Sequence, residues 1–77
     1  MHLIIAKVNE VLYDGEAESL TVPAVAGEMT VLARHMPLIT TLKQGIVTVR
    51  PKDNGDLTFQ IVSGILEVRP DGATVIL

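Results

Sequence analysis

Short, regularly spaced turn signals are the feature that most constrains this 77-residue chain. Gly, Asn and Asp recur along it, and the segments between them are about five to eight residues long. The signals are Asp14-Gly15, Gly27, Gly45, Asp53-Asn54-Gly55 and Asp71-Gly72. Such segments suit strands, and no window has the i, i+3, i+4, i+7 apolar spacing of a long amphipathic helix. We therefore expect an all-β domain, a two-sheet β-sandwich or flattened barrel of short strands.

The clearest local prediction is a hairpin about Asn54-Gly55. Apolar and polar residues alternate over residues 47–50 before the turn and over residues 57–61 after it. Because Asn-Gly readily adopts the positive φ angles that match strand twist, the two runs are predicted to pair. Pro51 is compatible with this because the first strand ends there. A second hairpin is predicted between residues 64–69 and 73–77, with Leu66 and Val68 facing Val75.

The remaining strands are less regular in sequence. We expect short strands at residues 3–8, 11–13, 18–22 and 29–33, and residues 35–43 show no clear period. Leu3-Ile4-Ile5 and Val75-Ile76-Leu77 place apolar side chains on both sides of a strand. Only one face of each sheet is buried in a two-sheet domain. The apolar side chains on the other face must therefore be covered by something outside the core. This excess predicts either a strand end covered by a loop or a contact with another protein.

Composition removes several classes of function. Hydrophobic residues make up 48% of the chain but aromatic residues only 3%, so the apolar content is mainly aliphatic and suits sheets. The net charge is −3, and the six basic residues are spread singly, which argues against nucleic-acid binding. No apolar run reaches the roughly 18 residues of a membrane span, and the N-terminus does not resemble a secretory signal. We expect a cytosolic protein without direct membrane insertion.

The chain offers few groups for catalysis or metal binding. His2 is expected at a strand edge, and His35 has no second His or Cys near it in the sequence. The hydroxyls of Ser19 and Ser63 lack the G-x-S-x-G setting of a nucleophile, and Ser63-Gly64 is predicted to be a bend. The glycines do not cluster into a phosphate-binding loop. We therefore expect no catalytic residue, no metal site and no cofactor.

Several motifs resemble the epsilon subunit of F-type ATP synthase over the whole chain. They are Gly27-Glu28-Met29-Thr30-Val31-Leu32 for G-E-x-x-V-L, His35-Met36-Pro37-Leu38-Ile39-Thr40 for P-G-H-A-P-L-L-T, Leu42-Lys43-Gln44-Gly45 for L-x-P-G, Tyr13-Asp14-Gly15-Glu16 for F-S-G-E, and residues 63–70 for S-G-G-x-L-E-V-x-P. The sequence departs from the family at Ala33-Arg34, where Pro-Gly is usual, and at Met36, where Ala is common. It also ends at Leu77, before the two C-terminal helices that usually follow.

The resemblance implies a non-catalytic rotor component of the central stalk, which couples ion flow to ATP synthesis by linking the gamma subunit to the c-subunit ring. Such a protein would be peripheral, on the cytoplasmic face of the inner or another energy-coupling membrane. It would have no ATP site and no inhibitory arm in these residues. Glu28 matches the family acid near the c-ring, His35 matches the family His of the neighbouring loop, and Arg34 is expected between them. These three residues are the predicted c-ring contact.

Simpler interpretations of these residues, and other functions, also have to be weighed. Glu28 could be a solvated turn carboxylate, and His35-Met36-Pro37 could be a loop corner. The main alternative is a biotinyl- or lipoyl-type carrier domain, which is also all-β and carries a modified Lys at a hairpin tip. Neither predicted hairpin tip is centred on a Lys, and Lys52 is displaced from one, so modification of Lys52 or Lys43 would be needed to support it. A sugar-binding module is disfavoured because Trp is absent.

Overall fold

The structure, a computed structural model, describes residues 1–34 and 36–77. Within these residues the chain forms eight β-strands and no helix, which confirms the predicted all-β fold. The strands are β1 His2–Lys7, β2 Glu10–Ala24, β3 Gly27–Leu32, β4 Leu38–Leu42, β5 Gly45–Pro51, β6 Leu57–Ile61, β7 Gly64–Arg69 and β8 Gly72–Ile76.

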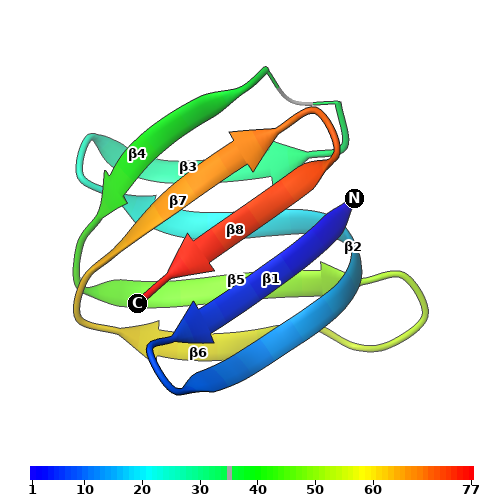
Figure 1. The fold of residues 1–77 in the computed structure, drawn as a ribbon, viewed down its shortest axis with the longest axis horizontal. Helices are drawn as coiled ribbons and strands as arrows, with labels where there is room; N and C mark the ends of the chain where they lie inside the picture. The colour runs from blue at the N-terminus through cyan, green and yellow to red at the C-terminus, as the bar shows by residue number, and fades with distance from the viewer. Residues whose placement is uncertain (35) are drawn as a thin grey trace.

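The strands form two layers that share β2 (Figure 1). The front layer consists of β4, β7, β8, β1 and the first part of β2, and the back layer consists of β3, the later part of β2, β5 and β6. Strand β1 pairs with β2 up to Glu16, and from Ala17 onward β2 pairs with β5 and then β3. The β1–β8 pair is parallel, whereas the other pairs are antiparallel. One continuous strand therefore joins both layers.

Both predicted hairpins are present, but the reason given for the first was wrong, because neither Asn54 nor Gly55 has a positive φ angle. Strands β5 and β6 pair with Val47 opposite Phe59, and Pro51 is the last residue of β5. Strands β7 and β8 pair with Leu66 opposite Val75. Because paired residues project to the same side, the alternation in the sequence places the apolar side chains of each hairpin on one face.

One prediction about strands was wrong, and one strand was not predicted. The separate strands at residues 11–13 and 18–22 are parts of the single strand β2, and Asp14-Gly15 lies inside it instead of forming a turn. The strand continues because its partner changes from β1 to β5, so its backbone groups stay paired despite the local turn signal. The segment without a clear period contains strand β4, in which Leu42 is buried but Ile39 is 72% exposed. An apolar residue on each side of β4 obscured its alternation.

The core between the layers is aliphatic. Its buried side chains are Leu3, Ile5, Ala17, Leu20, Val22, Ala24, Val31, Leu42, Val47, Val49, Ile61, Leu66, Val68, Ala73 and Val75. Every strand contributes at least one of them. Within residues 1–34 and 36–77, no polar or charged side chain belongs to this buried set. The groups that could act chemically or bind a partner therefore lie on the outside.

Gly72 sets the close approach of β8 to β1. Its φ angle is +158°, a conformation that L residues with a side chain rarely adopt. It pairs with His2, and a Cβ built on Gly72 would collide with the His2 backbone oxygen. The front layer thus requires glycine at this position.

Candidate protein-binding surfaces

The outer face of the front layer carries a row of apolar side chains. Ile65 pairs with Ile76, Ile76 with Ala6, and Ala6 with Val11, so the four side chains cross β7, β8, β1 and β2 in sequence. Ile65 and Ile76 are each 50% exposed and Val11 is 62% exposed. At about 4.8 Å between neighbouring strands, this apolar row is roughly 14 Å long. It accounts for part of the apolar excess in the sequence, and these side chains are on the outside.

The other half of the front face is charged and paired internally. His2 Nε2 lies 2.6 Å from Asp14 Oδ1, and Arg69 Nη1 lies 3.1 Å from Glu67 Oε1. Arg69 Nε also lies 3.3 Å from Asp71 Oδ1. His2 was predicted at a strand edge, but β1 is paired on both sides, so that prediction was wrong. Exposed ion pairs of this kind contribute little stability.

The outer face of the back layer carries a row of threonines instead. Thr30 pairs with Thr21, Thr21 with Thr48, and Thr48 with Thr58, so the row crosses β3, β2, β5 and β6. The Oγ1 atoms of Thr21 and Thr30 lie 3.0 Å apart, within hydrogen-bonding distance. The threonine row combines β-branched side chains, which suit strands, with hydroxyls that water can solvate.

Several chain connections gather at one end of the sandwich. The Val25 amide donates to the Thr41 carbonyl at 3.0 Å, and the Lys43 amide donates to the Pro23 carbonyl at 2.9 Å. These bonds tie the β2–β3 connection to the β4–β5 connection. In Figure 1 both lie at the left of the molecule, as does the β6–β7 connection.

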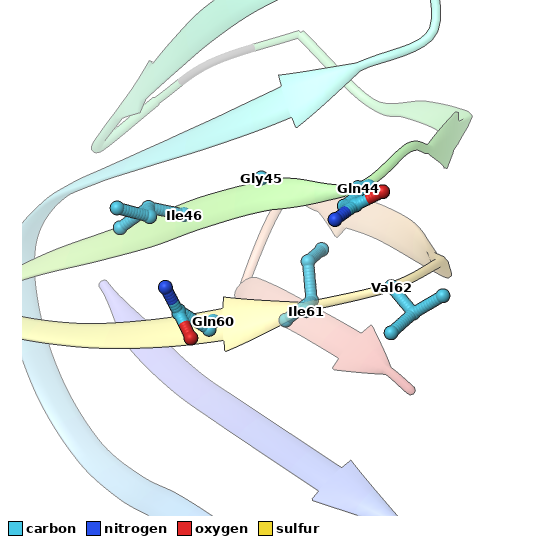
Figure 2. A pocket seen from close by; sticks show the side chains of 6 residues that line it. All are labelled: Gln44, Gly45, Ile46, Gln60, Ile61 and Val62. Atoms are coloured by element: carbon cyan, nitrogen blue, oxygen red, sulfur yellow. The ribbon is translucent and has the colours of Figure 1, made fainter.

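Two hollows extend this end toward the other connections. The first, of about 350 Å³, lies between the start of β5 and the end of β6 and is lined by Gln44, Gly45, Ile46, Gln60, Ile61 and Val62 (Figure 2). The second, of about 220 Å³, shares residues 60–62 and reaches Lys7, Ser63 and Leu77. Connections 8–9, 25–26, 43–44 and 62–63 therefore belong to one region, which we call the turn end.

Three exposed valines stand on separate connections of the turn end. Val8 is 92% exposed, Val62 80% and Val25 60%. We call them the tip valines. The charged side chains near them, also exposed, are Lys7, Glu10, Glu28 and Lys43. Two positive and two negative charges leave this part of the surface without a net charge.

The predicted c-ring residues do not all lie together. Glu28 is an exposed residue near the start of β3, opposite Pro23 and therefore at the turn end. Arg34 is exposed and follows the other end of β3. From Glu28 to Leu32 the strand covers four residues, about 13 Å at 3.3 Å per residue, and Arg34 lies in the turn beyond. His35 lies outside the described residues.

Arg34 has a φ angle of +69°, in the left-handed region that favours glycine. Its position is the one where the resembled family usually carries Gly. The backbone conformation therefore explains the usual residue, and the arginine here keeps a conformation that is costly for a residue with a Cβ.

No group of three His, Cys, Asp or Glu side chains that could hold a metal is found among residues 1–34 and 36–77. Over the same residues, no helix is long and apolar enough to cross a bilayer. Lys52, the candidate carrier lysine, lies in the connection between β5 and β6.

Comparison with known proteins identifies the family. The profile described as "ATP synthase, Delta/Epsilon chain, beta-sandwich domain" matches residues 1–77. A protein named ATP synthase epsilon chain from Nitrosomonas eutropha is 37% identical over 75 residues, which are 97% of this chain and 54% of that protein. The namesake from Laribacter hongkongensis is 36% identical over 99% of this chain and 55% of its own length. The chain belongs to the epsilon-subunit family of ATP synthase, and it spans about half the length of these relatives.

Solved structures agree with this assignment. A chain in the Euglena gracilis mitochondrial ATP synthase structure, titled as OSCP/F1/c-ring, superposes with a TM-score of 0.88 at 25% identity over 96% of this chain and 48% of its own. A chain in the Tetrahymena thermophila central stalk/c-ring structure superposes with a TM-score of 0.83 at 12% identity over 99% of this chain and 61% of its own, and that likeness concerns the fold alone. The family assignment leaves the carrier-domain alternative without support.

Proposed function

We propose that this chain is a non-catalytic rotor component of the central stalk of an F-type ATP synthase, where it links the gamma subunit to the c-subunit ring and so couples ion flow to ATP synthesis. The family supports this proposal, as do the central-stalk and c-ring assemblies that contain chains of the same fold. The observation that carries it is the apolar row, which places four apolar side chains next to one another across four strands. The protein would sit peripherally on the cytoplasmic face of an energy-coupling membrane.

The apolar row is the proposed gamma-facing surface. Its half-exposed isoleucines would complete their burial against a partner, and burial of apolar side chains is the main favourable term in association. The ion-paired half of the same face would form a polar rim, because interfaces commonly surround an apolar centre with polar groups. The back face carries the threonine row, with Leu32 and Ile46 exposed beside it, and the threonine hydroxyls would remain in water.

The c-ring contact is proposed at the turn end, centred on Glu28. The motif match also proposes Arg34 and His35 as ring contacts, and the place of Arg34 in the fold decides which arrangement this requires. Because Arg34 follows the far end of β3, it shares a contact with Glu28 if β3 lies lengthwise along the ring. If the sandwich stands on its turn end, Glu28 meets the ring and Arg34 does not. We favour the end-on arrangement because Glu28 lies among several connections there.

Replacement of the epsilon subunit in a reconstituted ATP synthase tests the function. The enzyme is the ATP synthase of the same organism, depleted of its epsilon subunit. Addition of this chain should restore ATP synthesis driven by an ion gradient. The chain alone should hydrolyse no ATP. The proposal requires both contacts, so it would be contradicted if the chain did not bind the isolated gamma subunit or did not bind c-ring vesicles.

Alanine substitutions at the two ends of β3 distinguish the two arrangements. In the end-on arrangement, Glu28→Ala lowers the ratio of ATP synthesised to ions moved, and Arg34→Ala leaves it unchanged. In the lengthwise arrangement, both variants lower the ratio. Both side chains are exposed, so each variant should fold, which a urea denaturation curve checks.

A further inference from the structure

We propose that the three tip valines, Val8, Val25 and Val62, are contact points of this chain on the c-ring. The inference rests on the proposed ring contact at Glu28 and extends it to residues on two other connections. Val25 lies three residues before Glu28 in the same β2–β3 hairpin, so it continues that contact directly. Val62 lines the second hollow together with Lys7, and Val8 follows Lys7 in the chain.

The chemistry of the turn end favours a protein occupant over a lipid surface. Its exposed charges are Lys7 and Lys43 against Glu10 and Glu28, so an anionic membrane would not be attracted. Segments that lie in a membrane interface typically use Trp, Phe or Leu together with several basic residues. The large exposed apolar residues on these connections are valines, which bury modest area against a protein without inserting deeply.

The separation of the valines suits a ring more than a single continuous partner surface. Each valine is on its own connection, and polar residues such as Asn9, Gln44 and Ser63 lie between or beside them. A ring of identical subunits presents the same loop repeatedly, so separate valines can each meet an equivalent loop. Individually weak contacts then reinforce one another, because binding at one raises the effective concentration at the next.

The hollow beside Val62 gives one of these contacts a place to receive a partner side chain. Figure 2 shows Ile46 and Gln60 at one part of it, and Gln44 and Val62 at the other. Gly45 has no side chain over its centre, and a Cβ there would lie 2.8 Å from Pro23 Cβ. The hollow thus combines two side-chain amides with apolar walls, which suits a small polar side chain at the turn of a ring loop.

Co-sedimentation of the labelled chain with vesicles containing purified c-ring tests the proposal, with vesicles of the same lipids but no protein as the reference. The chain should sediment with the c-ring vesicles and not with the protein-free vesicles. Val8→Asp, Val25→Asp and Val62→Asp should each weaken retention about threefold, and the triple variant at least thirtyfold, as expected for reinforcing contacts. Leu32→Asp is the matched control, because Leu32 is 56% exposed at the opposite end of β3.

The possible results separate the inference from the proposed function. Equal retention of wild type and all valine variants overturns the inference and leaves Glu28 as the contact. Equal retention by protein-free vesicles also overturns it, in favour of a lipid surface. If the wild-type chain is not retained by c-ring vesicles at all, the proposed ring contact fails as well. Matching denaturation curves for the variants and Leu32→Asp exclude unfolding as the cause.

Discussion

The two layers of the sandwich face the same core but differ on their outer faces. On the front, paired positions on four neighbouring strands carry two isoleucines, an alanine and a valine. On the back, four neighbouring strands carry four threonines at paired positions. Strand pairing allows either choice, because isoleucine, valine and threonine are all β-branched. The difference fits the proposed function, in which a partner covers the apolar row and the threonine row stays in water.

A substitution at Gly72 should destabilise the front layer, because Gly72 allows β8 to lie close to β1. We expect Gly72→Val to lower the free energy of unfolding by about 3 kcal/mol or more, because it combines an unfavourable φ angle with a backbone collision. Urea denaturation measures the change. Gly55→Val is the control, since a Cβ at Gly55 has no described neighbour within 4 Å. Equal stability of the two variants would show that β1 and β8 do not need this close approach.

A charge in the apolar row tests its proposed contact. Ile76→Lys should weaken binding to the gamma subunit of the same organism at least tenfold, about 1.4 kcal/mol, because an ammonium would be buried in an apolar interface. Isothermal titration calorimetry measures the affinity. Thr58→Lys places the same charge on the exposed back face and should change it less than about twofold. A larger effect from Thr58→Lys would reverse the assignment of the two faces.

The connection between the layers offers a smaller, stabilising change. Arg34 follows back-layer strand β3 and precedes front-layer strand β4, with φ at +69°. Arg34→Gly should raise stability by about 0.5–1 kcal/mol, because relief of left-handed strain exceeds the entropy that glycine adds to the unfolded chain. A higher urea midpoint with unchanged slope would confirm it. Arg34→Ala keeps the Cβ and should show no such gain.

The smallest expected effect concerns the threonine row itself. Thr30→Ala removes the hydroxyl that lies 3.0 Å from Thr21 and should lower stability by about 0.5 kcal/mol. Thr58→Ala, at the other end of the row, removes no comparable side-chain hydrogen bond in the described part of the chain. Thermal unfolding of both variants gives the comparison. Identical midpoints would mean that the row contributes by strand propensity alone.

Local sequence was sufficient where a turn and its strands are neighbours in the chain. The alternation on either side of residues 51–56 predicts the β5–β6 hairpin although Asn54 and Gly55 lack the expected positive φ angles, and Leu66 opposite Val75 followed from the same alternation. Strand β2 was divided in the prediction because Asp14-Gly15 resembles a turn. What keeps it extended is a change of partner at Ala17, which involves segments far away in the sequence.

The binding surfaces were predicted only in part. The apolar excess at Ile76 was visible in the sequence, but the row joins residues 6, 11, 65 and 76, and only the register brings them together. Glu28 and Arg34 were identified from motifs. Because only six positions separate them in the sequence, they were expected to lie close together. An extended strand converts this short spacing into opposite ends, whereas a turn would have kept them close.

Strand β2 has a mechanical consequence for the proposed rotor role. Its first half is bonded to β1 in one layer and its second half to β5 and β3 in the other. Where two sheets are joined only by loops, a sideways force on one sheet reaches the other mainly through packed side chains. Here the same force also travels along a covalent backbone, so the sheets cannot slide past each other unless ladder hydrogen bonds break together. A sandwich joined in this way resists shear as one solid body.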